Sequence, residues 1–230
     1  MRIAIISDIH SNPDALDAVV RGLPDYDELV CLGDVVGYGP QPNEVIERLR
    51  ELRPTVVLMG NHDDAAITGD TRDFSPHAAR AIDWTRKMVT QESLEYLATL
   101  KLSTRLERCE ATLALFHGSP RNPLTEYVYP GSPESAYRNI MQRAAADIVL
   151  LGHTHIPMLY QFNGRLVANP GSVGQPRDGD RRASFAMLTL SKGEASFEVR
   201  RVEYDVSSVA NRIMQGGLPR FLAERLYMGV

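Results

Sequence analysis

The chain has 230 residues, of which 43% are hydrophobic and 23% are charged, as in ordinary soluble globular proteins. Its formal net charge of −4, from 29 acidic and 25 basic residues, leaves no general electrostatic footprint for binding nucleic acid. No apolar run reaches the roughly 18 residues of a membrane span, and the N-terminal run is too short for a signal peptide. We therefore expect a cytoplasmic protein without a membrane segment, whose cysteines, Cys31 and Cys109, are buried free thiols in strands.

The chain opens with a continuous run of β-branched and small apolar residues, Ile3–Ile6, which predicts a strand buried on both faces. Asp8 and His10 follow this strand, with one residue between them. Asn12 and Pro13 are typical of an N-cap and a first helical position, so a helix is expected to begin there. The cap is a sufficient role for Asn12, whose side chain could also orient a nearby ligand.

Two further units of strand, polar tip and helix follow. Leu29–Leu32 is expected to form the second strand, ended by Gly33–Asp34, and Pro42 begins the next helix. Thr55–Met59 is expected to form a third buried strand, ended by the sequence G-N-H-D at 60–63. Three such units in succession predict a parallel sheet with right-handed crossovers.

A helical insertion at about 64–100 interrupts this alternation. Ser75 and Pro76 predict the start of one helix, and a second helix is expected at about 92–100. The pattern then resumes with a strand at Thr112–Phe116, a loop rich in glycine and proline, a helix at about 134–146 and a strand at Ile148–Leu151.

The remainder of the chain predicts antiparallel hairpins and then helices. Met158–Phe162 and Arg165–Ala168 flank an Asn-Gly pair, which is a strong hairpin signal. Ala183–Leu190 and Ala195–Tyr204 predict a second hairpin, and the segment at about 206–230 is expected to be helical.

Eight polar side chains follow the predicted buried strands: Asp8, His10, Asp34, Asn61, His62, His117, His153 and His155. Five of the six histidines of the chain are in this set, and only His77 is not. Because ligands collect beyond the carboxyl ends of parallel strands, we expect these side chains to lie together. Nitrogen and oxygen donors without a thiolate suit a divalent ion such as Mn, Fe, Zn, Co or Ni. The position of Asp34 in the sequence suits a carboxylate that is shared by two ions. Two ions about 3.5–4 Å apart stabilise the attacking and the leaving oxygen of an in-line displacement at phosphorus.

The order of these tips, D-x-H, G-D, G-N-H-D, H-G and G-H-T-H, resembles the calcineurin-like metallophosphoesterases. The resemblance implies an α/β fold, a four-layer αββα sandwich of two mixed β-sheets flanked by helices. It also implies two divalent metal ions, with Mn favoured. The ligands that it implies are Asp8, His10 and His155 for the first ion, Asn61, His117 and His153 for the second, and Asp34 as the bridge. His62 matches the catalytic histidine, which contacts the phosphoryl oxygens or the leaving group.

Two segments resemble the compact bacterial and archaeal phosphodiesterase branch of this superfamily. The sequence N-P-G-S at 169–172 is similar to a segment of that branch. Phosphatase relatives carry G-D-x-x-D-R-G, whose arginine grips phosphate, whereas this chain has Gly37 and Tyr38 in place of the Asp-Arg pair. We therefore expect a phosphodiesterase that hydrolyses small phosphodiesters by a metal-bridging hydroxide. Tyr38 and Arg177 are the candidate substrate-binding residues, although Arg177 would also suit a solvated turn.

Other functions stay open at this point. They are a phosphomonoesterase, a nucleotide or protein phosphatase of the same superfamily, and a non-catalytic metal-binding scaffold such as the retromer subunit that shares this fold. Scaffolds of that kind lack the catalytic histidine, whereas this chain has His62. A nuclease would need a basic groove, which the charge balance does not support.

The chain is expected to be a single metallophosphoesterase domain, 1–230, that binds a small-molecule phosphoester and neither nucleic acid in general nor a membrane. The apolar stretch from Leu218 to Met228 either packs onto the chain's own sheet or forms a homodimer contact. Asp63 is expected either to hold the ring of His62 or His10 in one tautomer or to cap the next helix.

Overall fold

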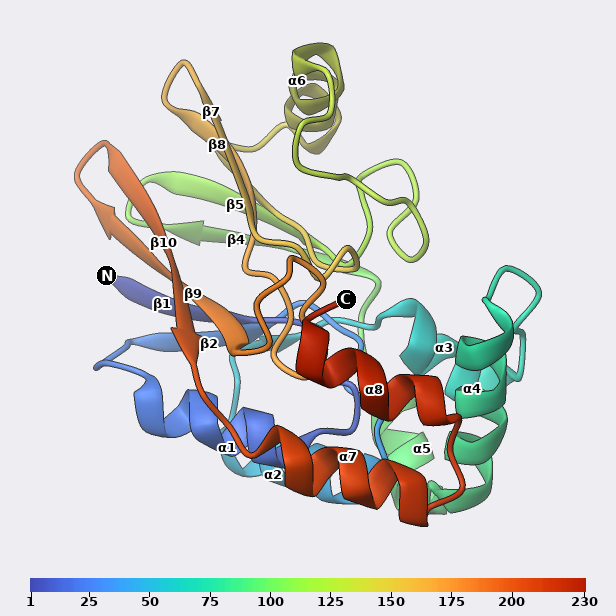
Figure 1. Cartoon of the computed structure of the whole chain (residues 1–230). Helices are drawn as coiled ribbons and strands as arrows, with labels where there is room; N and C mark the ends of the chain where they lie inside the picture. The colour runs from blue at the N-terminus through green and yellow to red at the C-terminus, as the bar shows by residue number, and fades with distance from the viewer.

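The computed structural model describes all of residues 1–230 and places two β-sheets between layers of helices (Figure 1). The strands are β1 (Arg2–Ile6), β2 (Glu28–Cys31), β3 (Val56–Val57), β4 (Ser103–Arg108), β5 (Ala111–Phe116), β6 (Ile148–Leu150), β7 (Met158–Phe162), β8 (Arg165–Asn169), β9 (Ala183–Ser191) and β10 (Glu194–Val202). The helices are α1 (Pro13–Gly22), α2 (Pro42–Glu51), α3 (Asn61–Thr68), α4 (Pro76–Met88), α5 (Gln91–Ala98), α6 (Glu134–Ala144), α7 (Val206–Gln215) and α8 (Arg220–Met228).

Each sheet has five strands and mixes parallel with antiparallel pairs. The first sheet has the order β10-β9-β1-β2-β3, and the second has the order β4-β5-β6-β8-β7. Both predicted hairpins are present, as the antiparallel pairs β7–β8 and β9–β10. The expected four-layer αββα sandwich is confirmed.

The alternation of side chains along β1 shows how the layers are filled. Ile3 and Ile5 point into the core between the two sheets, whereas Ala4 and Ile6 point into the core beneath α1 and α2. Burial of such side chains contributes about 1.5–3 kcal/mol each, so β1 is stabilised from both faces. Helix α6 covers the outer face of the second sheet (Figure 1).

The carboxyl ends of the parallel strands meet at one edge of the sandwich. Strand β1 pairs in parallel with β2, and β5 pairs in parallel with β6. Backbone hydrogen bonds join the loops beyond these ends within each sheet. The Asp8 amide donates to the Gly33 carbonyl at 2.9 Å, and the Gly152 amide donates to the His117 carbonyl at 2.9 Å. The His153 amide donates to Oδ2 of Asp8 at 3.2 Å, so the polar tips of the two sheets meet in a common space.

Three details of the sequence interpretation were wrong. The third strand spans only Val56–Val57 and is half-buried, because it lies at the edge of its sheet. Strand β4 was not expected, because it lies at another sheet edge and only one of its half-buried residues, Leu106, is apolar. Cys31 is buried as expected, but Cys109 is exposed in the turn between β4 and β5.

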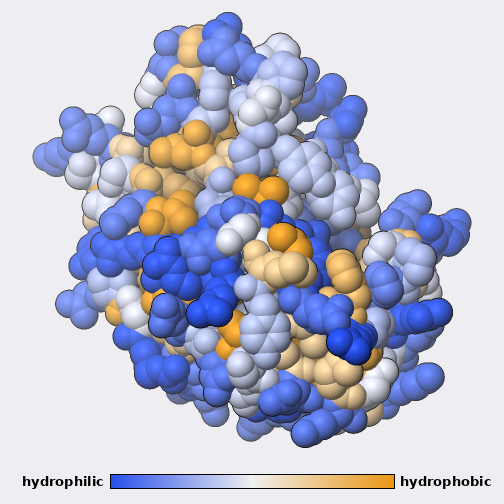
Figure 2. Space-filling model, viewed as in Figure 1, coloured by the Kyte–Doolittle hydropathy of each residue, from blue (hydrophilic) through white to orange (hydrophobic).

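The C-terminal helices α7 and α8 pack against α4 rather than against a sheet. Their buried residues, among them Val209, Leu222 and Leu226, share one apolar cluster with Ala81 and Tyr38. The face on which α8 lies is largely hydrophilic, with its apolar residues in separate patches (Figure 2). Phe221 and Met228 are among the exposed apolar residues, and the homodimer stays a prediction. No helix has the length and apolar character needed to cross a bilayer.

Candidate metal centre

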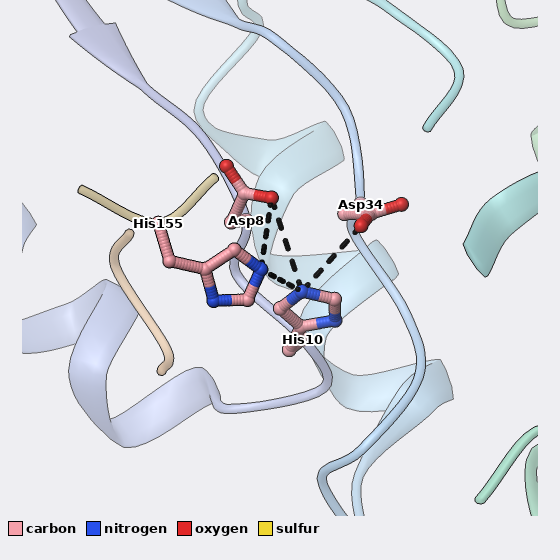
Figure 3. Close-up of side chains that lie close together, drawn as sticks. All are labelled: Asp8, His10, Asp34 and His155. Carbon is pink, nitrogen blue, oxygen red and sulfur yellow. Dashed lines mark hydrogen bonds and ion pairs between the residues drawn. The ribbon is translucent and has the colours of Figure 1, made fainter. Parts of the chain in front are cut away.

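One cluster of four buried side chains lies beyond the carboxyl end of the first sheet (Figure 3). Its members are Asp8, His10, Asp34 and His155. The Nε2 atom of His10 lies 3.1 Å from Nε2 of His155 and 3.5 Å from Oδ2 of Asp34. Oδ1 of Asp8 lies 3.3 Å from Nε2 of His155. One ligand atom from each residue lies within 4.8 Å of all the others, which is the spacing of a group that surrounds one ion.

The hydrogen bonds of His10 and His155 determine which ring nitrogens face this cluster. Nδ1 of His10 lies 3.0 Å from the Val36 carbonyl, and Nδ1 of His155 lies 2.6 Å from the Gln175 carbonyl. A carbonyl only accepts, so each Nδ1 carries the proton, and a neutral ring then has its lone pair on Nε2. Two lone pairs 3.1 Å apart repel each other unless a cation lies between them. The donor set therefore fits a divalent metal ion.

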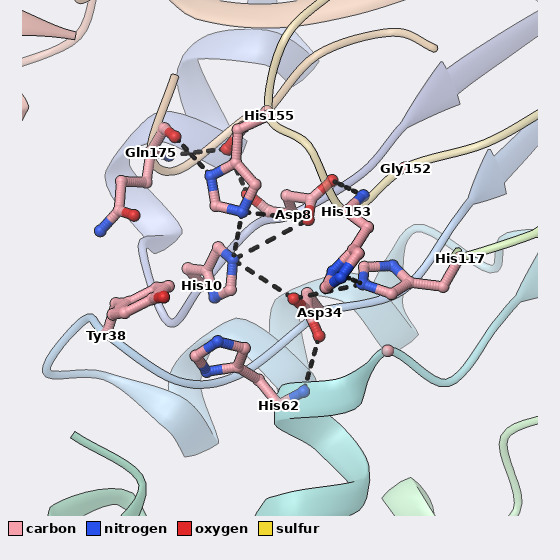
Figure 4. A network of polar contacts seen from close by, with 12 residues as sticks. Asp8, His10, Asp34, Tyr38, His62, His117, Gly152, His153, His155 and Gln175 are labelled. Carbon is pink, nitrogen blue, oxygen red and sulfur yellow. Dashed lines mark hydrogen bonds and ion pairs between the residues drawn. The ribbon is translucent and has the colours of Figure 1, made fainter. Parts of the chain in front are cut away.

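A second cluster adjoins the first and consists of Asp34, His117 and His153 (Figure 4). Nε2 of His117 lies 3.3 Å from Oδ2 of Asp34 and 3.1 Å from Nδ1 of His153. Oδ1 of Asn61 lies 3.3 Å from the same Nε2 atom. Oδ2 of Asp34 is thus common to both clusters, and no donor other than the histidines of the clusters contacts it.

The carboxylate of Asp34 is fixed by the N-terminus of α3. Its Oδ1 atom accepts the backbone N–H of His62 at 2.8 Å, so Oδ2 is left free for the clusters. This fit requires glycine at position 60, because a Cβ atom there would lie 2.0 Å from Oδ1 of Asp34. The G-N-H-D sequence therefore places both a short turn and a helix start against the shared carboxylate.

Backbone strain is concentrated around the two clusters. Seven non-glycine residues in the loops there have φ between 50° and 68°: Asp8, His10, Ser11, Asp34, Tyr38, His153 and His155. Such conformations cost of order 1–3 kcal/mol each and persist only where the surrounding structure imposes them. The strain turns the ligand side chains toward one point beyond the strands.

Burial controls the charge of the histidines. It lowers the pKa of His153 to about 3 and the pKa values of His10 and His155 well below the usual range, so these rings are neutral. Burial also lowers the pKa of His117, but the charge of Asp34 outweighs it and raises that pKa to about 9. The same pairing holds the pKa of Asp34 well below its usual range, against the effect of burial. A bound cation would replace the proton that His117 holds beside Asp34.

His62 lies beside the clusters but belongs to neither. Its ring packs between Tyr38, at a centroid distance of 4.4 Å, and Phe74, at 4.7 Å. Its Nδ1 atom is buried and has no hydrogen-bond partner. Phe74 gave no signal in the sequence, because its contact with His62 depends on how the helical insertion folds back.

Asp63 does not hold a histidine ring. Its carboxylate accepts the backbone N–H groups of Val35 at 3.2 Å, Val36 at 3.0 Å and Gly60 at 3.0 Å. The helix-capping alternative is therefore confirmed. Because the Val36 carbonyl accepts from His10, Asp63 positions that ring only through the backbone.

The two candidate substrate-binding residues lie together at the edge of the site. Arg177 donates from Nη2 to the hydroxyl of Tyr38 at 3.2 Å and to Oε1 of Gln175 at 3.0 Å. The Tyr38 ring in turn contacts His10 at a centroid distance of 4.6 Å. Tyr127 stacks on His153 at 3.9 Å, so a second aromatic ring borders the clusters from the long loop before α6.

Comparisons with known proteins point to one family. The sequence model of the calcineurin-like phosphoesterase superfamily domain matches residues 1–193, which include both clusters. An uncharacterized protein of Methanocaldococcus jannaschii is 35% identical over 99% of this chain and 98% of its own length. The crystal structure of a metallophosphoesterase from Sphaerobacter thermophilus matches with a TM-score of 0.86 and 35% identity, over 100% of this chain and 99% of that one. The phosphodiesterase YfcE of Escherichia coli is 25% identical over 82% of this chain and 87% of its own length.

Proposed function

Because the chain belongs to the calcineurin-like phosphoesterase superfamily, we propose that it is a dinuclear metal-dependent phosphodiesterase acting on small phosphodiesters. One observation carries the proposal above all others. Oδ2 of Asp34 faces both donor clusters, at 3.5 Å from Nε2 of His10 and 3.3 Å from Nε2 of His117, and no donor other than these histidines contacts it. A buried carboxylate oxygen in that position is suited to bridge two cations.

The clusters divide the proposed ligands between two ions. Asp8, His10 and His155 would hold the first, Asn61, His117 and His153 the second, and Asp34 both. Divalent ions bound there would supply charge that neutralises phosphoryl oxygens and would lower the pKa of water toward neutrality. The nitrogen and oxygen donors suit Mn, which we favour, as well as Fe, Zn, Co or Ni.

His62 is the residue that we propose acts directly on the substrate. Burial lowers its pKa to about 4, so the ring is neutral at physiological pH and carries one N–H. Packing between Tyr38 and Phe74 restricts the orientation of the ring. A preorganised donor of this kind stabilises charge that develops on phosphoryl oxygens or on the leaving group.

The aromatic border of the site supports a diester rather than a monoester. A diester has a second organic group, and the rings of Tyr38 and Tyr127 offer apolar surface next to His10 and His153. The Escherichia coli relative is itself named a phosphodiesterase.

The test is the ratio of kcat/KM for bis-p-nitrophenyl phosphate to that for p-nitrophenyl phosphate, measured with protein reconstituted with Mn. We expect the diester to be preferred and activity to be lost on chelation. A clear preference for the monoester would overturn the diester assignment. Two bound ions without turnover of either ester would instead favour the scaffold alternative.

A further inference from the structure

The segment beyond residue 193 contributes to the border of the site. Helices α7 and α8 lie outside the region matched by the superfamily model, yet α8 crosses the front of the molecule close to the site loops (Figure 1). Two polar contacts fix this segment: Nε1 of Trp84 donates to the Gly216 carbonyl at 2.7 Å, and the Gly179 amide donates to the Gly229 carbonyl at 2.9 Å. The helix pair is therefore held against both α4 and the loop that follows Arg177.

This docking brings Arg225 to the ring of Tyr38. The guanidinium carbon of Arg225 lies 6.0 Å from the centroid of that ring, and the corresponding atom of Arg177 lies 5.6 Å from it. The Tyr38 ring also contacts His10 and His62, at centroid distances of 4.6 and 4.4 Å. Two guanidinium groups from distant parts of the chain thus border the same ring, which also contacts a proposed metal ligand and the proposed catalytic residue.

The acidic residues nearest to these arginines in the sequence are already paired elsewhere. Asp178 forms a salt bridge with Arg201, and Asp180 forms one with Arg182 at 2.7 Å. In α8, Glu224 pairs with Arg220 at 2.6 Å. No Asp or Glu side chain pairs with Arg177 or Arg225. Nε of Arg225 donates to the oxygen of Val230, the last residue, whereas the buried Nε atom of Arg177 has no hydrogen-bond partner.

Two like charges beside one ring repel each other. Burial and the charge of Arg177 lower the pKa of Arg225 to about 10, although its Nε donates to the Val230 oxygen. The face of Tyr38 offers both guanidinium groups a cation–π contact, which compensates only in part. An oxyanion between the two arginines would supply the missing partner, in the bidentate geometry that guanidinium groups favour.

We propose that Arg177 and Arg225 together form an oxyanion-binding site in the substrate pocket, to which the C-terminal helix α8 contributes Arg225. This inference rests on the proposed function in so far as it places the site in a substrate pocket. The binding of an anion to the two arginines does not depend on that function. Its ligand is a phosphate or carboxylate group of the substrate. That group is either the phosphoryl group under attack or a second anionic group on one of the ester's alcohols.

Metal-free protein provides the direct test, because its ligand clusters then present the carboxylates of Asp8 and Asp34, which do not attract phosphate. Binding of inorganic phosphate to the chelator-treated full chain should be measured by calorimetry and by the shift in Tm. We expect Arg225→Gln to weaken binding about tenfold, the loss of one charge-assisted contact. Arg225→Lys should restore part of it. The matched control is Arg220→Gln, since Arg220 lies in the same helix and is 76% exposed.

The effects of Arg225→Gln on Tm and on phosphate affinity distinguish an anion-binding role of Arg225 from a structural one. If the role of Arg225 is purely structural, Arg225→Gln should lower the Tm in the absence of phosphate and leave the affinity for phosphate unchanged. That result, or wild-type protein that binds no phosphate, would overturn the proposal whether or not the metal-loaded protein is an esterase. If Arg225→Gln folds poorly, Arg177→Gln gives the same test from the other side of the pair.

The metal-loaded enzyme then identifies which anionic group is bound. If the arginines bind the phosphoryl group under attack, Arg225→Gln should lower kcat/KM more for dianionic p-nitrophenyl phosphate than for bis-p-nitrophenyl phosphate. If they bind a second group, which both chromogenic esters lack, the two values should fall by the same small factor. Either pattern supports the anion site, provided that phosphate binding to the metal-free variant is weakened.

Discussion

The Nε2 atoms of His10 and His155 lie 3.1 Å apart, and each ring has its Nδ1 proton committed to a backbone carbonyl. The two lone pairs therefore face each other in a buried space, where repulsion is screened little. The folded chain has strained loops and buried polar atoms at this point, which are costs that a bound cation offsets. We therefore expect metal binding to stabilise the fold.

The first prediction follows from that expectation. Loading the chelated protein with Mn at about 100 times Kd should add about 2.7 kcal/mol of stability for each ion bound, or about 5 kcal/mol for two, which for a chain of this size raises Tm by about 10–20 °C. Differential scanning calorimetry with and without Mn measures the shift. An unchanged Tm at saturating Mn would show that the clusters do not bind the ion.

The second prediction concerns His62. His62→Ala should reduce kcat about 10²–10⁴-fold, because a preorganised donor to the phosphoryl group is lost. Metal content should stay near normal, since His62 belongs to neither cluster. His77→Ala is the control, because His77 is exposed and its ring stacks on Phe221 rather than on a residue of the clusters. Full activity in His62→Ala, or loss of an ion, would contradict the role.

The third prediction concerns Asp63. Asp63→Ala leaves three backbone N–H groups without an acceptor and should cost at least about 3 kcal/mol in the free energy of unfolding. Urea denaturation measures the loss. The control is Asp64→Ala. The Asp64 carboxylate accepts no hydrogen bond, so this variant should lose much less of the free energy of unfolding. Equal stabilities for the two variants would refute the positioning role of Asp63.

The fourth prediction concerns Tyr38. Tyr38→Phe removes the hydroxyl that accepts from Arg177 and keeps the ring between the two histidines. We expect kcat/KM for the diester to fall about fivefold, mainly through KM, because one hydrogen bond that orients Arg177 is lost. Tyr38→Ala should also destabilise the fold, since the ring packs with α7 and α8. A change confined to kcat in Tyr38→Phe would contradict the binding role.

The sequence predicted most of the fold and nearly all of the two clusters, for a specific physical reason. Asp8, Asp34 and His117 each follow a continuous apolar strand, and parallel strands end at a common edge. Position in the chain was therefore enough to bring these side chains together. The pattern was less informative at sheet edges, where Leu106 is the only apolar residue of β4 and β3 spans two residues.

The residues that border the clusters could not be predicted in the same way. Phe74 reaches His62 because α3 and α4 fold back on each other, and Arg225 reaches Tyr38 because α8 docks on the loop after Arg177. These contacts depend on the packing of separate helices rather than on the period of one element. The apolar residues of the C-terminal segment indicated that it packs against the rest of the chain. They did not indicate that Arg225 of this segment would lie beside Tyr38.

The central claim is that Asp34 joins two metal ions, and the metal content of Asp34→Asn tests it most directly. Wild-type protein reconstituted with Mn and dialysed should hold two ions per chain by inductively coupled plasma mass spectrometry, and Asp64→Asn should match it. Asp34→Asn should lose affinity at both positions at once, because an amide oxygen is a weaker ligand than the carboxylate shared by the clusters. Two ions bound to Asp34→Asn with wild-type affinity would contradict the bridge and the dinuclear centre built on it.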